Sequence, residues 1–266
     1  VGDTAHQAKA LNRLAYVARL QRSYTASQHA VDQALTLLAN DDAERSFSYF
    51  VKGVIAFDHG DWANAVEQFQ RSIQWIEPLG DQRTLARRLR NLGPALRALG
   101  RYDEAIACYT RAIALFEAVY DPVQQAVTRM NLGVVYLMSE QPTQALAQFT
   151  PAEPVFREVH DRLHLAMLQT NQGIAYRLLQ EWAQAEQYQK ASIEHFQQLG
   201  NLAAQVNALD ELGLVYLGQQ ALDKAQATFQ EATGLLEQMQ LDPAYPALCT
   251  TIQEHQQALS GLLTQA

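Results

Sequence analysis

Apolar and small residues recur along this chain at helical spacing, and the helical segments come in pairs. In residues 85–99, apolar or small side chains fall at steps of three and four, which is the period of an amphipathic helix and not the alternation of a strand. A second segment of the same kind follows Gly100 and runs from Tyr102 to Phe116. The pattern predicts helical hairpins and an all-α fold.

The hairpins repeat every forty residues. When the repeats are aligned, one position holds glycine in five of them, and the position twelve residues later holds alanine in the same five. We call such a set of equivalent positions a column. A fixed spacing of this size is typical of stacked-repeat proteins, in which one unit cannot bury its apolar face alone. We expect the first helix of each pair to approach the second until the alanine meets the glycine. The columns are Gly53, Gly93, Gly133, Gly173 and Gly213, and Ala65, Ala105, Ala145, Ala185 and Ala225.

The breaks between hairpins carry side-chain oxygens suited to capping the next helix: Asp81, Asp121, Asp161 and Asn201. The first hairpin departs from the pattern, because Arg13 stands in the glycine place. We expect one continuous domain, a fragment of a larger protein, since the chain begins at Val1. Its predicted parts are hairpins at about 5–40, 41–80, 81–120, 121–160, 161–200 and 201–241, then a capping helix over 242–266 that starts at Asp242 and Pro243.

Composition narrows the classes of function. A net charge of −8 and a pI near 5.3 argue against nucleic acid as the main partner, because phosphate neutralisation needs clustered cations. No apolar run approaches membrane length and no signal segment opens the chain, so we expect no membrane contact and a cytoplasmic location. The two cysteines, Cys108 and Cys249, lack metal-ligand spacing and are expected to be free thiols.

Signals for catalysis are missing from the sequence. It contains no nucleophile motif, no paired carboxylate constellation and no glycine-rich phosphate loop. His160 and His164 are four apart, but no third metal ligand is placed with them. We therefore predict a protein that is not an enzyme and holds neither a cofactor nor a metal.

The string Asn91-Leu92-Gly93, followed by Tyr102 and Ala105, resembles the tetratricopeptide repeat. The usual period is about 34 residues; the forty-residue form is similar to repeats in kinesin light chain and in bacterial STAND signalling NTPases of the MalT and NB-ARC kind. The resemblance implies a right-handed superhelix, an α-solenoid, whose first helices line a concave groove. In the bacterial class such repeats sense an inducer for an NTPase domain, and no Walker motif occurs here.

An arginine row is expected on this inner face. Guanidinium groups hold carboxylate or phosphate bidentately, although charged helix faces are as often solvated or paired with acidic neighbours. The row comprises Arg83, Arg87, Arg90 and Arg97; the preceding hairpin offers Phe47, Phe50 and Phe57, the following one Val127, Met130 and Val134, and residues 161–200 add Met167 and Arg177.

Three asparagines resemble the amide ladder of the O-GlcNAc transferase repeats, which grips an extended peptide backbone: Asn91, Asn131 and Asn171. A hydrogen bond within or between helices is the alternative for these amides. We expect a module that binds a protein or peptide segment, acidic with apolar flanks. A sensor of a small-molecule inducer is the first alternative and a self-association module the second.

Overall fold

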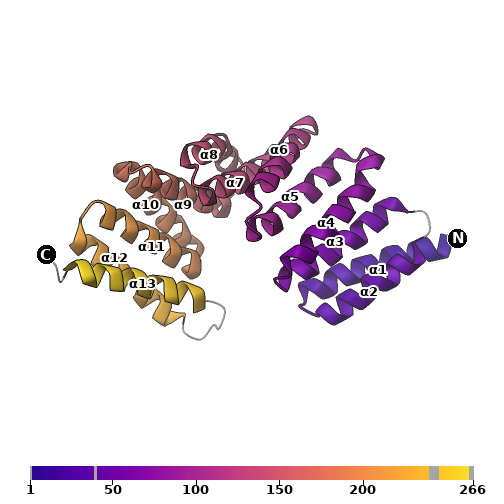
Figure 1. Cartoon of the computed structure of the whole chain (residues 1–266), viewed down its shortest axis with the longest axis horizontal. Helices are drawn as coiled ribbons and strands as arrows, with labels where there is room; N and C mark the ends of the chain where they lie inside the picture. Colours follow the sequence, from indigo (N-terminus) through magenta and orange to yellow (C-terminus); the bar gives the residue numbers. More distant parts are fainter. Residues whose placement is uncertain (1, 39–40, 240–245, 264–266) are drawn as a thin grey trace. The chain divides into compact units, whose positions relative to one another are not determined.

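The computed structural model describes residues 2–38, 41–239 and 246–263, and within these residues every regular element is a helix (Figure 1). Six helical hairpins are followed by a last helix, which confirms the all-α repeat array. The expected start of that helix at Asp242 and Pro243 lies outside the described residues. The helices are α1 Gly2–Leu20, α2 Tyr24–Leu37, α3 Asp42–Asp58, α4 Trp62–Ile76 with the 3₁₀ turn η1 Glu77–Leu79, α5 Gln82–Ala98, α6 Tyr102–Ala118, α7 Pro122–Met138, α8 Pro142–Glu158, α9 Arg162–Leu178, α10 Trp182–Leu199, α11 Leu202–Gly218, α12 Leu222–Gln238 and α13 Pro246–Leu263.

The chain forms two compact units, residues 1–135 and 136–266, which divide inside α7. In the first unit α3 packs against α1, α2 and α4, and α4 packs against α5. In the second unit α9 packs against α8, α10 and α11, and α13 packs against α11 and α12. Within each unit, neighbouring hairpins complete one another's core, as the repeat predicts.

Side-chain caps begin most of the first helices. The Asp81 carboxylate accepts a hydrogen bond from the Thr84 amide at 3.0 Å, and the Asn201 side chain accepts one from the Ala204 amide at 3.2 Å. Hydrogen bonding to Thr84 lowers the pKa of Asp81. These bonds satisfy amides that have no partner inside the helix. The predicted caps are confirmed, and Asp41, Asp61, Asp121 and Asp161 cap in the same way.

The glycine column makes room for a large side chain. A Cβ added to Gly93 would lie 2.2 Å from Cζ of Tyr109, and one added to Gly213 would lie 2.4 Å from Cε1 of Phe229. Both partners stand sixteen residues after their glycine. The side chain nearest to the notch is therefore not the alanine but the ring that follows it by four residues.

The first hairpin is set two residues away from the expected register. Its second helix begins at Tyr24, 38 residues before Trp62, whereas the later second helices begin forty residues apart. Ala15 therefore takes the glycine place: it is fully buried, and its carbonyl accepts a hydrogen bond from Oγ of Ser27 at 2.6 Å. The placement of Arg13 in that column is corrected.

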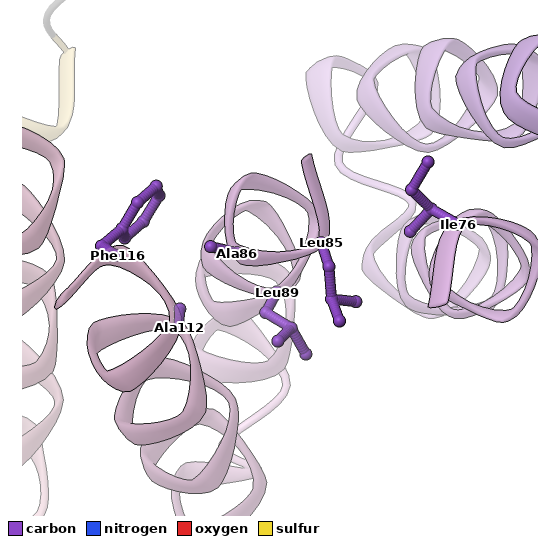
Figure 2. Close-up of a cluster of buried hydrophobic side chains, with 6 residues drawn as sticks. All are labelled: Ile76, Leu85, Ala86, Leu89, Ala112 and Phe116. Carbon is purple, nitrogen blue, oxygen red and sulfur yellow. The ribbon is translucent and has the colours of Figure 1, made fainter. Parts of the chain in front are cut away.

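One core cluster of the first unit is made of aliphatic and aromatic side chains. Figure 2 shows one cluster, in which side chains from α4, α5 and α6 come together. Burying each large apolar side chain contributes about 1.5–3 kcal/mol. The cluster consists of Ile76, Leu85, Ala86, Leu89, Ala112 and Phe116.

The α9–α10 hairpin has a polar interior instead. Nε2 of Gln189 donates to the Thr170 carbonyl at 3.1 Å, and the Thr170 hydroxyl lies 2.6 Å from that of Ser192. Nε2 of Gln172 donates to Glu153 at 3.0 Å. The side-chain oxygens of Gln172 and Gln189 are buried without a hydrogen-bond partner. Since an unpaired buried acceptor is costly, we expect this hairpin to be less stable than the hairpins beside it.

The last helix, α13, completes the second unit. Ile252 and Leu259 are buried against α11 and α12. Nδ1 of His255 lies 2.8 Å from Oδ1 of Asp210, which joins α13 to α11 by a polar contact as well. Burial raises the pKa of Asp210. The capping helix is thus held by both apolar and polar contacts.

Candidate functional site

A cavity of about 350 Å³ lies in the first unit between α1, α3 and α5. It brings together four of the residues predicted to bind a ligand: Phe50, Phe57, Arg90 and Asn91. Its other lining residues are Tyr16, Arg19, Val54, Phe69 and Pro94. All but Phe69 belong to the first helices of their hairpins, so this cavity is a segment of the groove that the repeat implies.

The aromatic side chains give this cavity rigid apolar walls. The ring centroids of Phe50 and Phe69 are 6.0 Å apart, and Phe57 meets Trp62 edge to face at 4.8 Å. Rings packed against one another present a fixed surface at little cost in conformational entropy. The cavity is therefore suited to an apolar side chain of a ligand.

Two arginines and one amide supply its polar groups. Arg19 is bound to Asp58 through two hydrogen bonds of 2.6 and 2.9 Å. Arg90 donates to Oε1 of Gln124, and burial, followed by the nearby Arg87, lowers the pKa of Arg90. The Asn91 side chain makes no hydrogen bond within the described residues. Its donor and acceptor are both available to a peptide group.

A second cavity, of about 400 Å³, lies in the second unit between α9, α10 and α11. It contains Met167 and Asn171, two more of the predicted residues, together with Asn207 of the next first helix. Met167 is 41% exposed. Flexible methionine beside primary amides suits an apolar side chain flanked by backbone polar groups.

The remaining predicted residues lie elsewhere. Arg83 pairs with Asp121 at 3.0 Å, and Arg177 pairs with Glu211 at 3.0 Å. For these two arginines the structure favours the paired alternative over a free binding group. Met130 is 4% exposed, so little of it is available to a ligand. Outside the two cavities are also Phe47, Arg87, Arg97, Val127, Asn131 and Val134.

Sequence reasoning missed three residues near the first cavity. Tyr16 and Arg19 line it, but the two-residue offset of the first hairpin hid their inner position. Arg88 is buried beside Phe50 and was passed over because its neighbours Arg87 and Arg90 fitted the expected row. A usable signal existed, since the Arg88 column is otherwise small or apolar: Ser48, Thr128, Leu168 and Ala208.

A third cavity, of about 1190 Å³, opens between α2, α3 and α4. Lys52 stands there in a column that holds leucine in three other hairpins, and its Nζ lies 2.9 Å from Asp32. The hollow that the first two hairpins leave here has both polar and apolar walls. Gln28 and Asn64 line it, as does Gln68, whose Oε1 has no partner.

Among the described residues, no group of three His, Cys, Asp or Glu side chains is close enough to hold a metal ion. Nδ1 of His164 is bound to Asp161 at 2.7 Å, and its ring stacks on Phe156. None of the described helices has the length and apolarity needed to cross a bilayer.

Comparison with known proteins gives a consistent picture of the fold. The tetratricopeptide repeat family model matches residues 84–158 and 164–238, more than half of the chain. None of the curated proteins matches the sequence.

Three solved structures are similar over nearly the whole chain. A STAND protein with a tetratricopeptide repeat sensor from Pyrococcus horikoshii has a TM-score of 0.76 at 13% identity, over 92% of this chain and 37% of that one. The apo quorum sensor NprR from B. thuringiensis has a TM-score of 0.75 at 15% identity, over 92% and 68%. BtubC from P. vanneervenii has a TM-score of 0.67 at 17% identity, over 91% and 94%. At these identities the likeness is one of fold.

Proposed function

Because this chain belongs to the tetratricopeptide repeat family, we propose that it is a non-catalytic module that binds an extended peptide segment of a partner along its first helices. In this proposal the module is the docking or sensing arm of a bacterial signal-transduction protein. The likeness to a STAND sensor and to a quorum sensor supports that setting.

The observation that carries the proposal is the cavity between α1, α3 and α5. Phe50 and Phe57 form an apolar wall there, and the unbonded amide of Asn91 stands beside it. An apolar pocket next to a paired donor and acceptor fits one peptide side chain and its backbone group. The cavity that holds Met167 and Asn171 repeats this combination in the second unit.

The test is peptide binding by matched variants. Peptides are selected by the whole chain from a random phage-displayed library, and their affinities are measured by fluorescence anisotropy. Phe57→Ala removes one wall of the cavity and is expected to weaken binding at least tenfold, about 1.4 kcal/mol or more. Leu79→Ala removes an exposed apolar side chain that lines no cavity described above and is expected to change affinity less than twofold. Equal losses in both variants would contradict the proposed groove.

Small-molecule sensing is a second candidate, favoured by the cavity between α2, α3 and α4. Its volume of about 1190 Å³ accommodates a metabolite, and Lys52, Asp32 and the orphaned oxygen of Gln68 offer polar contacts. A thermal-shift screen with sugars, nucleotides and organic acids tests it, because a ligand that binds only the native state raises the melting temperature. Lys52→Leu, which restores the leucine of the repeat, should abolish any shift that arises in this cavity.

A further inference from the structure

Arg88 is a charged residue in an apolar position of the first unit. It is 7% exposed, in a column that elsewhere holds small or apolar side chains. Its guanidinium carbon lies 4.1 Å from the ring centroid of Phe50 and 5.7 Å from that of Phe47. Burial, with Arg87 nearby, lowers its pKa to about 10, so Arg88 is still charged at neutral pH.

No carboxylate of the described residues contacts this guanidinium directly, although the negative charge of Asp81 acts on it. Among the described residues Arg88 takes part in no ion pair, and its Nε is enclosed without an acceptor. The two Nη atoms are not enclosed in this way. An unpaired buried charge destabilises a fold, so an apolar side chain would be at least as stable at this position. Stability therefore gives no reason for an arginine here.

A second guanidinium group, that of Arg13, lies over one of the same two rings, that of Phe47. The guanidinium carbon of Arg13 lies 4.3 Å from the Phe47 centroid, and the centroids of Phe47 and Phe50 are 6.0 Å apart. Arg13 has one acidic partner, Glu44, at 3.3 Å, and Arg87 is exposed next to Arg88. The helix that carries Arg87 and Arg88, Gln82–Ala98, contains five arginines and no acidic residue. In a chain of net charge −8 this is a local excess of positive charge.

From this geometry we infer that Arg13 and Arg88, whose guanidinium groups lie over the rings of Phe47 and Phe50, anchor a carboxylate of the bound peptide, with the exposed Arg87 adding positive charge nearby. The inference rests on the proposed function and names the chemistry of one subsite. A guanidinium group is planar and holds its donors in one plane, which matches the two oxygens of a carboxylate. Phe50 also lines the cavity beside Asn91, so the anchor and the groove adjoin.

The experiment compares Arg88→Met with a control that removes the same charge elsewhere. Arg101→Met is that control, because Arg101 is half-exposed and pairs with Glu104 at the start of α6. Peptides selected from the random library by the wild-type chain are expected to carry Asp or Glu beside an apolar residue. When that acidic residue of the peptide is replaced by its amide, the peptide should bind wild type and Arg101→Met roughly tenfold more weakly. The loss corresponds to one charge-assisted pair. The same replacement in the peptide should change its affinity for Arg88→Met less than twofold. The melting temperature of Arg88→Met should equal or exceed that of wild type.

Each other outcome has a defined meaning. Peptides selected without acidic preference, or an equal loss on Arg88→Met, would overturn the anchor and leave peptide binding intact. If wild type selects no peptide, the proposed function fails. A second probe then tests, separately from peptide binding, whether the arginines bind a carboxylate. That probe is glutarate, titrated at constant ionic strength while the arginine Nε–H signals are followed by NMR. A shift of the Arg88 signal that glutarate causes and chloride does not supports the anchor, and the absence of such a shift overturns it.

Discussion

Replacing Gln189 by phenylalanine should stabilise the protein. Gln189 is fully buried, and its Oε1 has no hydrogen-bond partner. It occupies the position that faces the repeat glycine, here Gly173, and its Nε2 lies 2.5 Å from where a Cβ on that glycine would be. In four other hairpins this position is aromatic: Phe69, Tyr109, Phe149 and Phe229. The substitution therefore restores the side chain that this notch seats elsewhere in the chain.

The expected gain follows from four contributions. Removing the orphaned oxygen recovers about 1–3 kcal/mol, and losing the Nε2 hydrogen bond to Thr170 costs about 1 kcal/mol. A buried ring contributes about 1.5–3 kcal/mol, and fitting its extra volume costs about 1–3 kcal/mol. The net effect of Gln189→Phe is a stabilisation of about 1 kcal/mol. For a chain of this size that corresponds to a rise in melting temperature of about 2–4 °C.

Hydrogen exchange measured by mass spectrometry shows where in the chain the stabilisation occurs as well as how large it is. Amides of α9 and α10 should exchange more slowly in Gln189→Phe, because the stability of a repeat array is built from local terms. Gln197→Phe is the control, since Gln197 is exposed on the same helix. A lower melting temperature, or unchanged exchange in α9 and α10, would refute the reasoning that the polar interior weakens this hairpin.

Three further effects are expected. Gly213→Ala should lower the free energy of unfolding in urea by about 1–3 kcal/mol, because the new Cβ would collide with Phe229. In the control Gly234→Ala, in the next helix, the new Cβ meets no atom within 4 Å, so this change should be neutral or stabilising. Similar losses of stability in both variants would count against the notch. Asp81→Ala should cost about 1 kcal/mol at pH 7. Because hydrogen bonding lowers the pKa of Asp81, the difference from wild type should persist above about pH 4 and shrink as the pH falls through that lowered value. A difference that does not change with pH in acid would exclude the charged cap. Burial raises the pKa of Cys108 to about 11, so its alkylation by iodoacetamide at pH 8 should be more than roughly a hundredfold slower than that of a free thiol until the chain unfolds, as peptide mapping would report.

Much of the fold could be predicted from the sequence because the repeat fixes local structure. Asp81 and Asn201 begin helices through side-chain bonds that depend only on the next three residues. The partner of each glycine could not be predicted in the same way. Alanine and aromatic columns share one period, and only the packed helices decide that Tyr109, and not Ala105, fills the notch of Gly93.

The candidate site could be predicted only in part for a similar reason. Phe50 and Asn91 follow from helical spacing beside the glycine column, and the structure brings them to one cavity. The ion pair of Arg177 with Glu211 joins different hairpins, so the pattern within one helix does not reveal it. Arg88 differs in that its charge departs from a column of small or apolar residues, and the sequence alone displays this departure.

The hydrogen-bonded interior of α9–α10 also bears on how a partner is sensed. Half of the residues that line the cavity with Met167 and Asn171 belong to this hairpin, which we expect to be the first part of the second unit to open. A ligand that holds only the closed form shifts that opening equilibrium by mass action. Occupation of the cavity would then change the lifetime of the closed form of α9–α10 and its neighbours. A bound partner would thus be detected as a change in local opening within the array.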